Sequence, residues 1–289
     1  MSWTTIDQDK CTGCGICVTR CPRCFSLEEG EIIADSHTDN CILCGHCLAL
    51  CPTGAITHSQ LPATDFIEIH KAAHIDTNTF VEFLKERRSH RHFTDKPIPR
   101  KELELLIEAG RWSPTGSNVQ NVEIIVYSDP EKIKKLSDLT VDYFLWIGEK
   151  VRRKIARLEA EGQQNTPDYQ MTLRSLGIGE RMTREKQSGR DPIFHQAPVV
   201  MVFHSISPTS APKDNAVLAA QTMALTARTL GLESCYIGIF EVAAEYYPPL
   251  RDLLALPAQH KVFDTMIMGY PKFKFLKTVS RNSLKVRWE

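Results

Sequence analysis

The stretch CTGCGICVTRCPRC, residues 11–24, holds five of the chain's ten cysteines. Thirty residues further on, CILCGHCLALCP, residues 41–52, has the same spacing, and both stretches read C-x2-C-x2-C-x3-C-P. Nine of the ten cysteines lie at or before Cys51, in a chain of 289 residues. The sequence therefore begins with a duplicated unit in which sulfur carries the chemistry.

The spacing of each cysteine run predicts an iron–sulfur cluster. Three thiolates two residues apart can bind one face of a cubic cluster, and the turn after the third carries the fourth cysteine to the other cluster. One predicted [4Fe–4S] cluster is bound by Cys11, Cys14, Cys17 and Cys51. The second is bound by Cys41, Cys44, Cys47 and Cys21. The small residues between ligands let backbone N–H groups approach the cluster sulfides.

Structural zinc is the alternative to a cluster, because zinc also binds thiolates. Zinc sites pair two C-x2-C knuckles and need neither the third cysteine nor the proline, so the spacing favours clusters. Over about residues 2–58 the sequence resembles bacterial two-cluster ferredoxins. Cys24 lies outside the motif and is interpreted as a spare thiol near a cluster, whereas His46 is interpreted as a spacer.

Composition limits the partners of the chain. It is 42% hydrophobic and 24% charged with zero net charge, which is typical of a globular protein and gives no general attraction to nucleic acid or membrane. The first ten residues lack the apolar core of a secretory signal, and no apolar run reaches the ~18–20 residues that cross a bilayer. We expect a cytoplasmic protein that binds neither nucleic acid nor membrane.

The remaining chain alternates helix and strand signals. We expect a ferredoxin domain over 1–60, a linker over 61–78 and a second domain over 79–289. Asp129-Pro130-Glu131 predicts the start of a long helix that ends near Glu161, and Gly231 predicts the end of an alanine-rich helix over 214–230. Strands are predicted at 122–127, 198–205, 234–240 and 262–269.

Motifs of several common enzyme classes are missing from the sequence. No G-x-G-x-x-G follows a strand, and neither G-x4-G-K-[ST] nor H-E-x-x-H occurs. The histidines and carboxylates show no dyad or triad spacing. Dinucleotide-binding Rossmann, P-loop, zinc-protease and other hydrolase functions therefore lack support.

Four short stretches of the second domain stand out in order. They are ERRSHRHF (86–93), RWSPTGSNVQNVEIIV (111–126), GLESCYIGIF (231–240) and GYPKFKFLKTVSR (269–281). Together they resemble the nitroreductase family of FMN-dependent oxidoreductases, over about residues 79–289. The resemblance implies an intertwined homodimer with two FMN molecules at the subunit interface. The expected fold class is α+β, a two-cluster ferredoxin fold followed by a nitroreductase-like mixed sheet flanked by helices.

The resemblance also assigns FMN contacts. The contacts to the flavin phosphate and ribityl oxygens are Arg87, Arg88 and Ser89, and Arg91 falls where the family places a base near the flavin N1–C2=O edge. The turn that the partner subunit supplies to the ring matches Thr115, Ser117 and Asn118. The backbone beside the reactive face matches Tyr236, Ile237 and Gly238.

The basic C-terminal stretch supplies the last predicted contact. Arg281 is the best match to the phosphate-binding base after Gly-Tyr-Pro, and Lys277 is the reserve. A guanidinium fork suits phosphate better than an ammonium group does. Cys235 is interpreted as a buried small hydrophobic residue and not as a redox centre.

The two halves together predict a redox function. FMN accepts one electron or two, each cluster carries one, and a single chain raises their effective concentration. We expect an oxidoreductase that reduces a nitroaromatic, quinone or similar small acceptor, with electrons delivered through the clusters, by NAD(P)H, or both. Its chemistry is centred on the flavin, so no catalytic side chain is assigned. A ferredoxin-type protein is a candidate redox partner. The alternative is a non-catalytic electron carrier that serves a partner protein.

Overall fold

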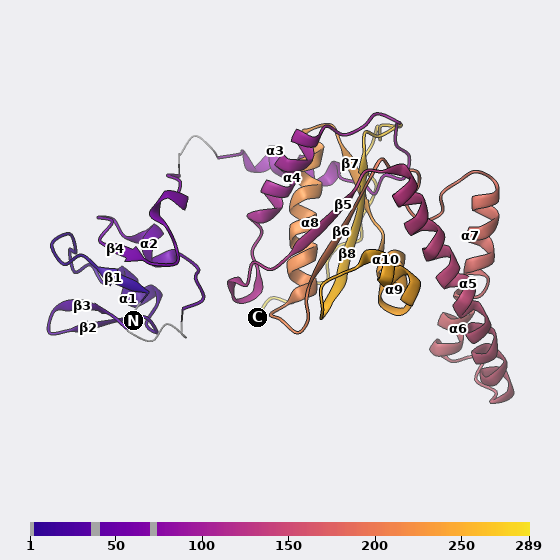
Figure 1. The fold of residues 1–289 in the computed structure, drawn as a ribbon, viewed down its shortest axis with the longest axis horizontal. Helices are drawn as coiled ribbons and strands as arrows, with labels where there is room; N and C mark the ends of the chain where they lie inside the picture. Colours follow the sequence, from indigo (N-terminus) through magenta and orange to yellow (C-terminus); the bar gives the residue numbers. More distant parts are fainter. Residues whose placement is uncertain (1–2, 36–40, 70–73) are drawn as a thin grey trace. The chain divides into compact units, whose positions relative to one another are not determined.

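The computed structural model describes residues 3–35, 41–69 and 74–289. The chain divides into two compact units, the first comprising Met1–Asp76 with Ser117–Val119 and the second comprising Thr77–Gly116 with Gln120–Glu289 (Figure 1). In the described residues no helix combines the length and the apolar character needed to cross a membrane.

The first unit contains short elements that surround the cysteines. Two antiparallel pairs join β1 (Thr4–Ile6) with β4 (Ile56–His58), and β2 (Phe25–Glu28) with β3 (Glu31–Ala34). Each cysteine run continues into one helical turn, α1 (Ile16–Arg20) or α2 (His46–Leu50), and a 3₁₀ turn, η2, spans Ala63–Asp65. The small core is formed by Cys24, Phe25, Ile32 and Ile56.

The sheet of the second unit has four strands in the order β5-β6-β8-β7. Their bounds are Glu123–Tyr127 for β5, Val199–Ile206 for β6, Glu233–Tyr236 for β7 and His260–Gly269 for β8. The three strand pairs are antiparallel. One parallel bridge, Ser89 with Ser234, extends the pairing beyond β7, so the chain segment after α3 follows the sheet edge.

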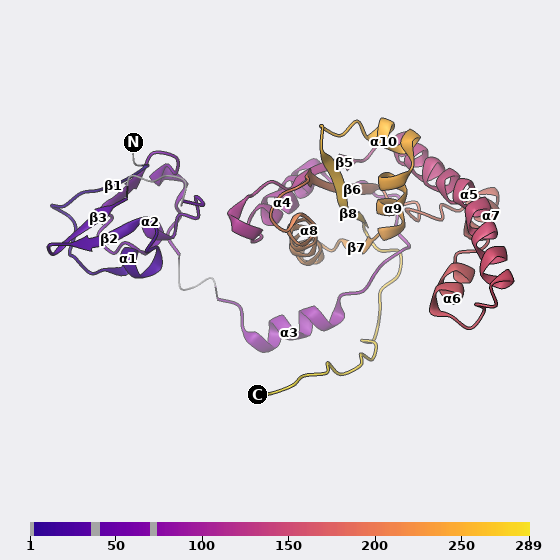
Figure 2. The same cartoon turned by 90° about the horizontal axis from the view of Figure 1, so that it is seen from below.

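Helices cover both faces of this sheet (Figures 1 and 2). The helices of this unit are α3 (Thr77–Glu86), α4 (Arg100–Arg111), α5 (Pro130–Ala160), α6 (Pro167–Arg174), α7 (Ile178–Gln187), α8 (Pro212–Thr229), α9 (Gly238–Tyr246) and α10 (Pro248–Leu254). Of these, α6 and α7 pack on α5 and not on the sheet. A 3₁₀ turn, η4, spans Gly116–Asn118.

The alternation of side chains along β6 explains the two layers. Met201 and Phe203 share a core with α4 and α8, whereas Val200 and Val202 share a core with α5, α9 and α10. Successive side chains of a strand point to opposite faces, so an uninterrupted apolar strand requires cover on both. β6 is buried over seven of its eight residues, which fits a strand between two helical layers.

Several predicted elements are confirmed, and one is wrong. Asp129 caps α5 by accepting hydrogen bonds from the N–H groups of Glu131 and Lys132, and Gly231 follows α8 with φ 75°. The strand predicted over 234–240 ends at Tyr236, and Gly238 begins α9. Phe240, Ala243 and Ala244 are buried at helical spacing, so core packing favours a helix there.

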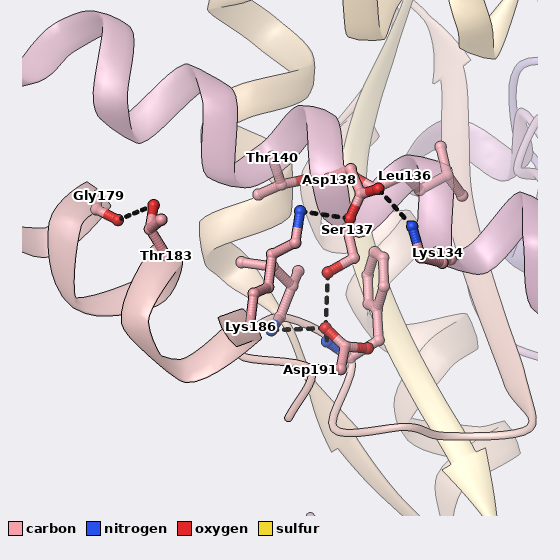
Figure 3. A network of polar contacts seen from close by, with 11 residues as sticks. Lys134, Leu136, Ser137, Asp138, Thr140, Gly179, Thr183, Lys186 and Asp191 are labelled. Atoms are coloured by element: carbon pink, nitrogen blue, oxygen red, sulfur yellow. Dashed lines mark hydrogen bonds and ion pairs between the residues drawn. The ribbon is translucent and has the colours of Figure 1, made fainter. Parts of the chain in front are cut away.

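The long helix α5 is fastened to the chain around α7 by a polar network (Figure 3). Asp138 forms ion pairs with Lys134 and Lys186, at 2.9 and 2.6 Å. Ser137 donates its hydroxyl proton to Asp191 at 2.6 Å. These contacts hold α7 and the loop after it against the first half of α5.

The C-terminal segment after β8 contains neither helix nor strand and is exposed from residue 272 to 289. Figure 2 shows it as an extended yellow trace. Its exposed large apolar side chains include Phe273, Phe275, Leu276, Leu284 and Trp288. A segment this rich in exposed apolar side chains has the composition of a surface that another chain covers.

Candidate functional site: cysteine clusters and a basic loop

Four cysteines from distant positions meet in the first unit. Cys11, Cys14, Cys17 and Cys51 line one cavity, together with Cys47. The cavity therefore brings together the ligand set that the spacing predicts for the first cluster, including the cysteine contributed by the second run. Gly15 and Gly45 precede α1 and α2 with φ 69° each, and this left-handed conformation turns the chain between successive cysteines.

The second predicted ligand set is also grouped. Cys44, Cys21 and Cys41 lie near enough to Cys47 for the negative charge of their thiolate forms to act on its thiol. Burial raises the pKa of the free Cys47 thiol to about 11, and these neighbours add to the effect. Such a crowded group of thiolates is stabilised by a cation, and bound iron deprotonates the thiols. The donor set therefore fits a second cluster.

Two hydrogen-bond donors point at predicted ligand sulfurs. The Ala55 N–H donates to Cys51 Sγ at 3.3 Å. His58 Nδ1 accepts the Gln60 N–H at 3.1 Å, which leaves the ring proton on Nε2, and Nε2 lies 3.6 Å from Cys41 Sγ. Donors of this kind orient metal ligands and tune the metal, so both contacts favour a metal-binding role.

Cys24, the cysteine outside the motif, is part of the apolar core of the first unit. Only 7% of its surface is exposed. Burial raises the pKa of its thiol to about 12, and Cys21 adds to the shift. Cys24 therefore packs as a small apolar residue beside the second predicted ligand group.

The basic loop after α3 lies along the edge of the second unit's sheet. Ser89 bridges Ser234 of β7, and the His90 N–H donates to the Ser234 carbonyl at 3.0 Å. These contacts place Arg87 beside β7. Burial raises the pKa of Glu233 and the pKa of Tyr236, and the positive charge of Arg87 lowers both in part. The structure therefore brings Arg87 and Ser89 close to the start of the Tyr236–Gly238 stretch.

The basic loop carries three guanidinium groups. Arg87, Arg88 and Arg91 form no ion pair with a described carboxylate, although Arg87 and Arg88 are half-buried. Arg91 and Ser89 line a cavity of about 350 Å³. His90 lines this cavity and also a second one of about 430 Å³, which Lys277 lines as well. Unpaired guanidinium groups beside a cavity are a donor set for a phosphate, so these residues fit the phosphate-bearing end of FMN.

Tyr236 and its neighbours connect β7 to α9. Ile237 donates its N–H to the Thr265 carbonyl at 2.8 Å, and Tyr236 donates its hydroxyl to Gln221 at 3.1 Å. Burial raises the pKa of the Tyr236 phenol, with Asp264 adding to the effect. Gly238 is exposed and begins α9. Cys235 is 2% exposed, which confirms its interpretation as a buried small hydrophobic residue.

The turn before β5 is held at the other end of the sheet. Gly116 donates its N–H to Asn215 of α8 at 2.8 Å, and the Gln120 N–H donates to Thr115 Oγ1 at 3.1 Å. Ser117 and Asn118 have positive φ values of 51° and 54°. β5 begins beside the end of β6, whereas Ser89 lies beside the start of β7. Because β6 and β7 both run antiparallel to β8, the end of β6 and the start of β7 lie at opposite ends of the sheet. Within the second unit, Thr115 and Gly116 thus lie away from Arg87, and the assignment of the turn to the partner's flavin stays a prediction.

The two predicted phosphate-binding bases of the C-terminal segment are both exposed. Lys277 lines the cavity beside the basic loop, with Arg281 four residues further on. Aromatic contacts keep the nearer part of this segment on the loop, because His90 packs on Phe275 and His92 on Phe273, with ring centroids 4.9 and 5.5 Å apart.

Three residues at this cavity were missed by sequence reasoning. His90, Arg228 and Glu233 line it together with Glu86. Arg228 and Glu233 form an ion pair in which both side chains are largely buried. Their charges look like ordinary surface charges in the sequence, and only the pairing of α8 with β7 brings them to the loop.

The fold and the donor sets define a flavin- and iron–sulfur-dependent oxidoreductase. The Nitroreductase family model matches residues 84–270, and the 4Fe-4S binding domain model matches residues 4–23 and 36–57. The chain belongs to the Nitroreductase family, and it is an FMN-dependent oxidoreductase with a 4Fe–4S ferredoxin domain at its N-terminal end.

Relatives with named activities are similar to part of this chain. A 4-nitrobenzoate reductase from Nocardioides sp. (strain LMS-CY) is 26% identical over 206 residues, which are 66% of this chain and 80% of the relative. An FMN reductase (NADPH) from Bacillus subtilis (strain 168) is 27% identical over 161 residues, which cover 56% of this chain and 54% of the relative. The match thus spans about half the length of that reductase.

A solved structure has the same fold. The nitroreductase with bound FMN from Bacteroides fragilis superposes with a TM-score of 0.54 at 21% identity, and the match covers 73% of this chain and all of that one. The predicted fold class is therefore confirmed.

Proposed function

We propose that this oxidoreductase reduces a small organic acceptor, such as a nitroaromatic or a quinone, at FMN bound by the second unit. The observation that carries the proposal is the set of guanidinium groups at Arg87, Arg88 and Arg91, which form no ion pair with a carboxylate among the described residues, and of which Arg91 lines a cavity together with Ser89. The names of the relatives, a 4-nitrobenzoate reductase and an FMN reductase, support this class of acceptor.

Each group of residues has a proposed role in holding the cofactors. Arg87, Arg88 and Ser89 would bind the flavin phosphate and ribityl chain, with Arg281 or Lys277 as the further phosphate contact. Arg91 would place a positive charge at the edge of the ring. The eight motif cysteines would hold two 4Fe–4S clusters. When bound, FMN supplies hydride or single-electron exchange and the clusters supply single electrons.

We further propose that the protein is a homodimer in which each partner completes the flavin site of the other. The support is the exposed apolar side chains of the C-terminal segment and the separation of Thr115 from Arg87 within the second unit. The proposed domain organisation is a ferredoxin domain over 1–60, a linker over 61–78 and a flavin-binding domain over 79–289.

Flavin retention tests the assignment of the basic loop. Arg87→Ala and Arg281→Ala should each lower the FMN content of the purified protein, because each removes a phosphate contact, while the iron content stays unchanged. The matched controls are Arg100→Ala and Arg287→Ala, whose side chains are exposed and paired with Glu104 and Glu289. Loss of iron in the loop variants, or equal FMN loss in the controls, would contradict the assignment.

Anaerobic stopped-flow tests the electron donor and the acceptor. The full protein, loaded with FMN and clusters, is mixed with NADH, NADPH or a reduced ferredoxin, and bleaching of the flavin is recorded. Bleaching by ferredoxin alone would exclude direct reduction by a pyridine nucleotide. The reduced protein is then mixed with a nitrobenzoate or a quinone. If neither acceptor is reduced but a partner protein is, the protein is a non-catalytic electron carrier and the enzyme proposal is wrong.

A further inference from the structure

Three metal-ligating side chains meet at one end of the second unit's sheet. Glu123 at the start of β5 lies directly opposite His204 of β6, and His204 lies opposite Val262 of β8. His260 precedes Val262 by two residues and so points to the same face. The strand register therefore brings these three side chains together, although Glu123 and His260 are 137 residues apart in the sequence.

The ligand atoms of these residues are near the spacing of a shared ion. His204 Nδ1 and His260 Nδ1 are 3.0 Å apart, and the other ring nitrogen of His260, Nε2, is 3.8 Å from a Glu123 carboxylate oxygen. His260 offers a single nitrogen to an ion, so the distance that matters for Glu123 is the one to that nitrogen. One ligand atom from each residue lies within 4.8 Å of the others. Tetrahedral zinc with bonds of about 2.0–2.2 Å holds its ligand atoms about 3.3 Å apart. The imidazole pair is already close to this spacing.

The carboxylate can complete the set with little rearrangement. The Glu123 side chain is 55% exposed, so it can rotate by the remaining ångström or so without displacing packed neighbours. His204 is 4% exposed, and the His260 side chain is 10% exposed, so both imidazoles are held in place. A fixed histidine pair with one adjustable carboxylate can close around an ion.

The donor chemistry selects the metal. Two imidazoles and one carboxylate suit zinc, whereas calcium and magnesium require oxygen ligands. Three protein ligands leave a fourth position, and His260 also lines a cavity of about 810 Å³ through which water has access. The site is separate from the basic loop, since His260 begins β8 whereas the loop bridges the start of β7, which pairs with the end of β8.

We propose that Glu123, His204 and His260 bind a zinc ion that joins the ends of β5, β6 and β8. Without the ion, the same histidines form a simple hydrogen-bonded pair, in which one Nδ1–H donates to the other Nδ1. In that case Glu123 has no required role. The two arrangements therefore differ in zinc stoichiometry and in the effect of a change at Glu123.

The test uses the full protein with reconstituted clusters, dialysed against micromolar Zn²⁺, with zinc and iron measured in the same samples. We expect one zinc per chain in addition to the cluster iron. Glu123→Gln and His260→Gln should each weaken zinc binding at least tenfold, whereas His74→Gln, which changes an exposed histidine of the first unit, should not. X-ray absorption at the zinc edge should show nitrogen and oxygen ligands at about 2.0–2.2 Å and no sulfur at about 2.3 Å.

Three results would overturn the proposal. The first is a sulfur shell around the zinc, which would show that cluster cysteines hold it. The second is equal zinc binding by the wild type and both variants. The third is no bound zinc at micromolar concentration, which would leave only the hydrogen-bonded pair. Because Glu123 is half exposed, Glu123→Gln keeps the test valid even if His260→Gln fails to fold, and circular dichroism identifies that failure.

Discussion

Arg228 of α8 donates from Nε to a carboxylate oxygen of Glu233 in β7, across 3.1 Å. The same guanidinium pairs with Glu86 at 3.0 Å, donates to the Phe83 carbonyl, and lies 4.7 Å from the centre of the Phe83 ring. One side chain thus fastens the end of α3 to the sheet. Arg87 follows directly, so the position of the basic loop depends on this attachment.

Arg228→Met should lower the free energy of unfolding by about 3 kcal/mol, because it leaves the Glu233 carboxylate buried without its partner. Urea unfolding measures the change. The double variant with Glu233→Gln should recover part of the loss, since the uncompensated charge is removed. Arg100→Met is the matched control, because Arg100 pairs with Glu104 on an exposed helix surface. Similar stabilities of Arg228→Met and Arg100→Met would contradict the buried role.

The stability of the second unit should fall between about pH 4 and pH 7 through Asp264. Burial, with the nearby Glu241 carboxyl group, raises the pKa of Asp264 to about 7 from an ordinary value of 3.8. The folded protein then holds a proton that the unfolded chain releases. This contribution is fully present below about pH 4 and is lost as the pH rises through 7, by about 2–4 kcal/mol.

Asp264→Asn tests this dependence, because an amide does not titrate. Its free energy of unfolding relative to the wild type should increase from pH 5.5 to pH 8, as measured by urea unfolding at both values. Asp252→Asn, an exposed aspartate of α10, serves as the control and should show no such trend. A constant difference between Asp264→Asn and the wild type across this range would mean that Asp264 is ionised throughout.

His58 should raise the reduction potential of the cluster that Cys41 is proposed to bind. Its Nε2–H points at Cys41 Sγ, and a donor to a ligand sulfur stabilises the more negative reduced state. His58→Phe should therefore lower the potential of one cluster, as followed by redox titration with electron paramagnetic resonance. His46→Phe changes an exposed histidine of α2 and is the control. An equal shift of both clusters in His58→Phe would indicate a general disturbance of the fold.

Asp191→Ala should loosen α7 and the loop after it. Asp191 accepts hydrogen bonds from the Ser137 hydroxyl and from the N–H groups of Ile193 and Phe194, and these three residues are buried. Removing the acceptor leaves them unsatisfied, which should cost about 2–3 kcal/mol in a thermal or urea transition. Asp168→Ala, at an exposed pair with Lys154, should cost less than 1 kcal/mol, as is typical of surface ion pairs. A similar cost for both would contradict the capping role.

Local signals in the sequence predicted a large part of this fold. The continuous apolar run of β6 and the Asp129-Pro130 start of α5 depend on neighbouring residues alone, and both are confirmed. The strand predicted through 234–240 is wrong beyond Tyr236, because its apolar residues suit a strand and a buried helix equally well. Only contact with the core decides between them.

The candidate site could be predicted only in part. The cysteine ligand sets follow from spacing, because a cluster imposes its geometry on nearby residues. His58 and Arg228 act through contacts with residues far along the chain, and their sequence neighbours give no hint of this. The grouping of Glu123, His204 and His260 depends on strand register. The pairing of β6 with β8 includes a register shift between Phe203 and His204 that no local sequence pattern predicts.

β8 carries His260 at its first residue and ends at Gly269, where the chain enters the Gly-Tyr-Pro stretch. It pairs with β6 along its whole length and with β7 at its end, so it unfolds with its neighbours. Any ligand that binds only the folded state shifts the same unfolding equilibrium by mass action. The proposed zinc ion at one end and the proposed FMN contacts at the other should therefore protect each other's sites from heat and proteolysis without any conformational change passing between them.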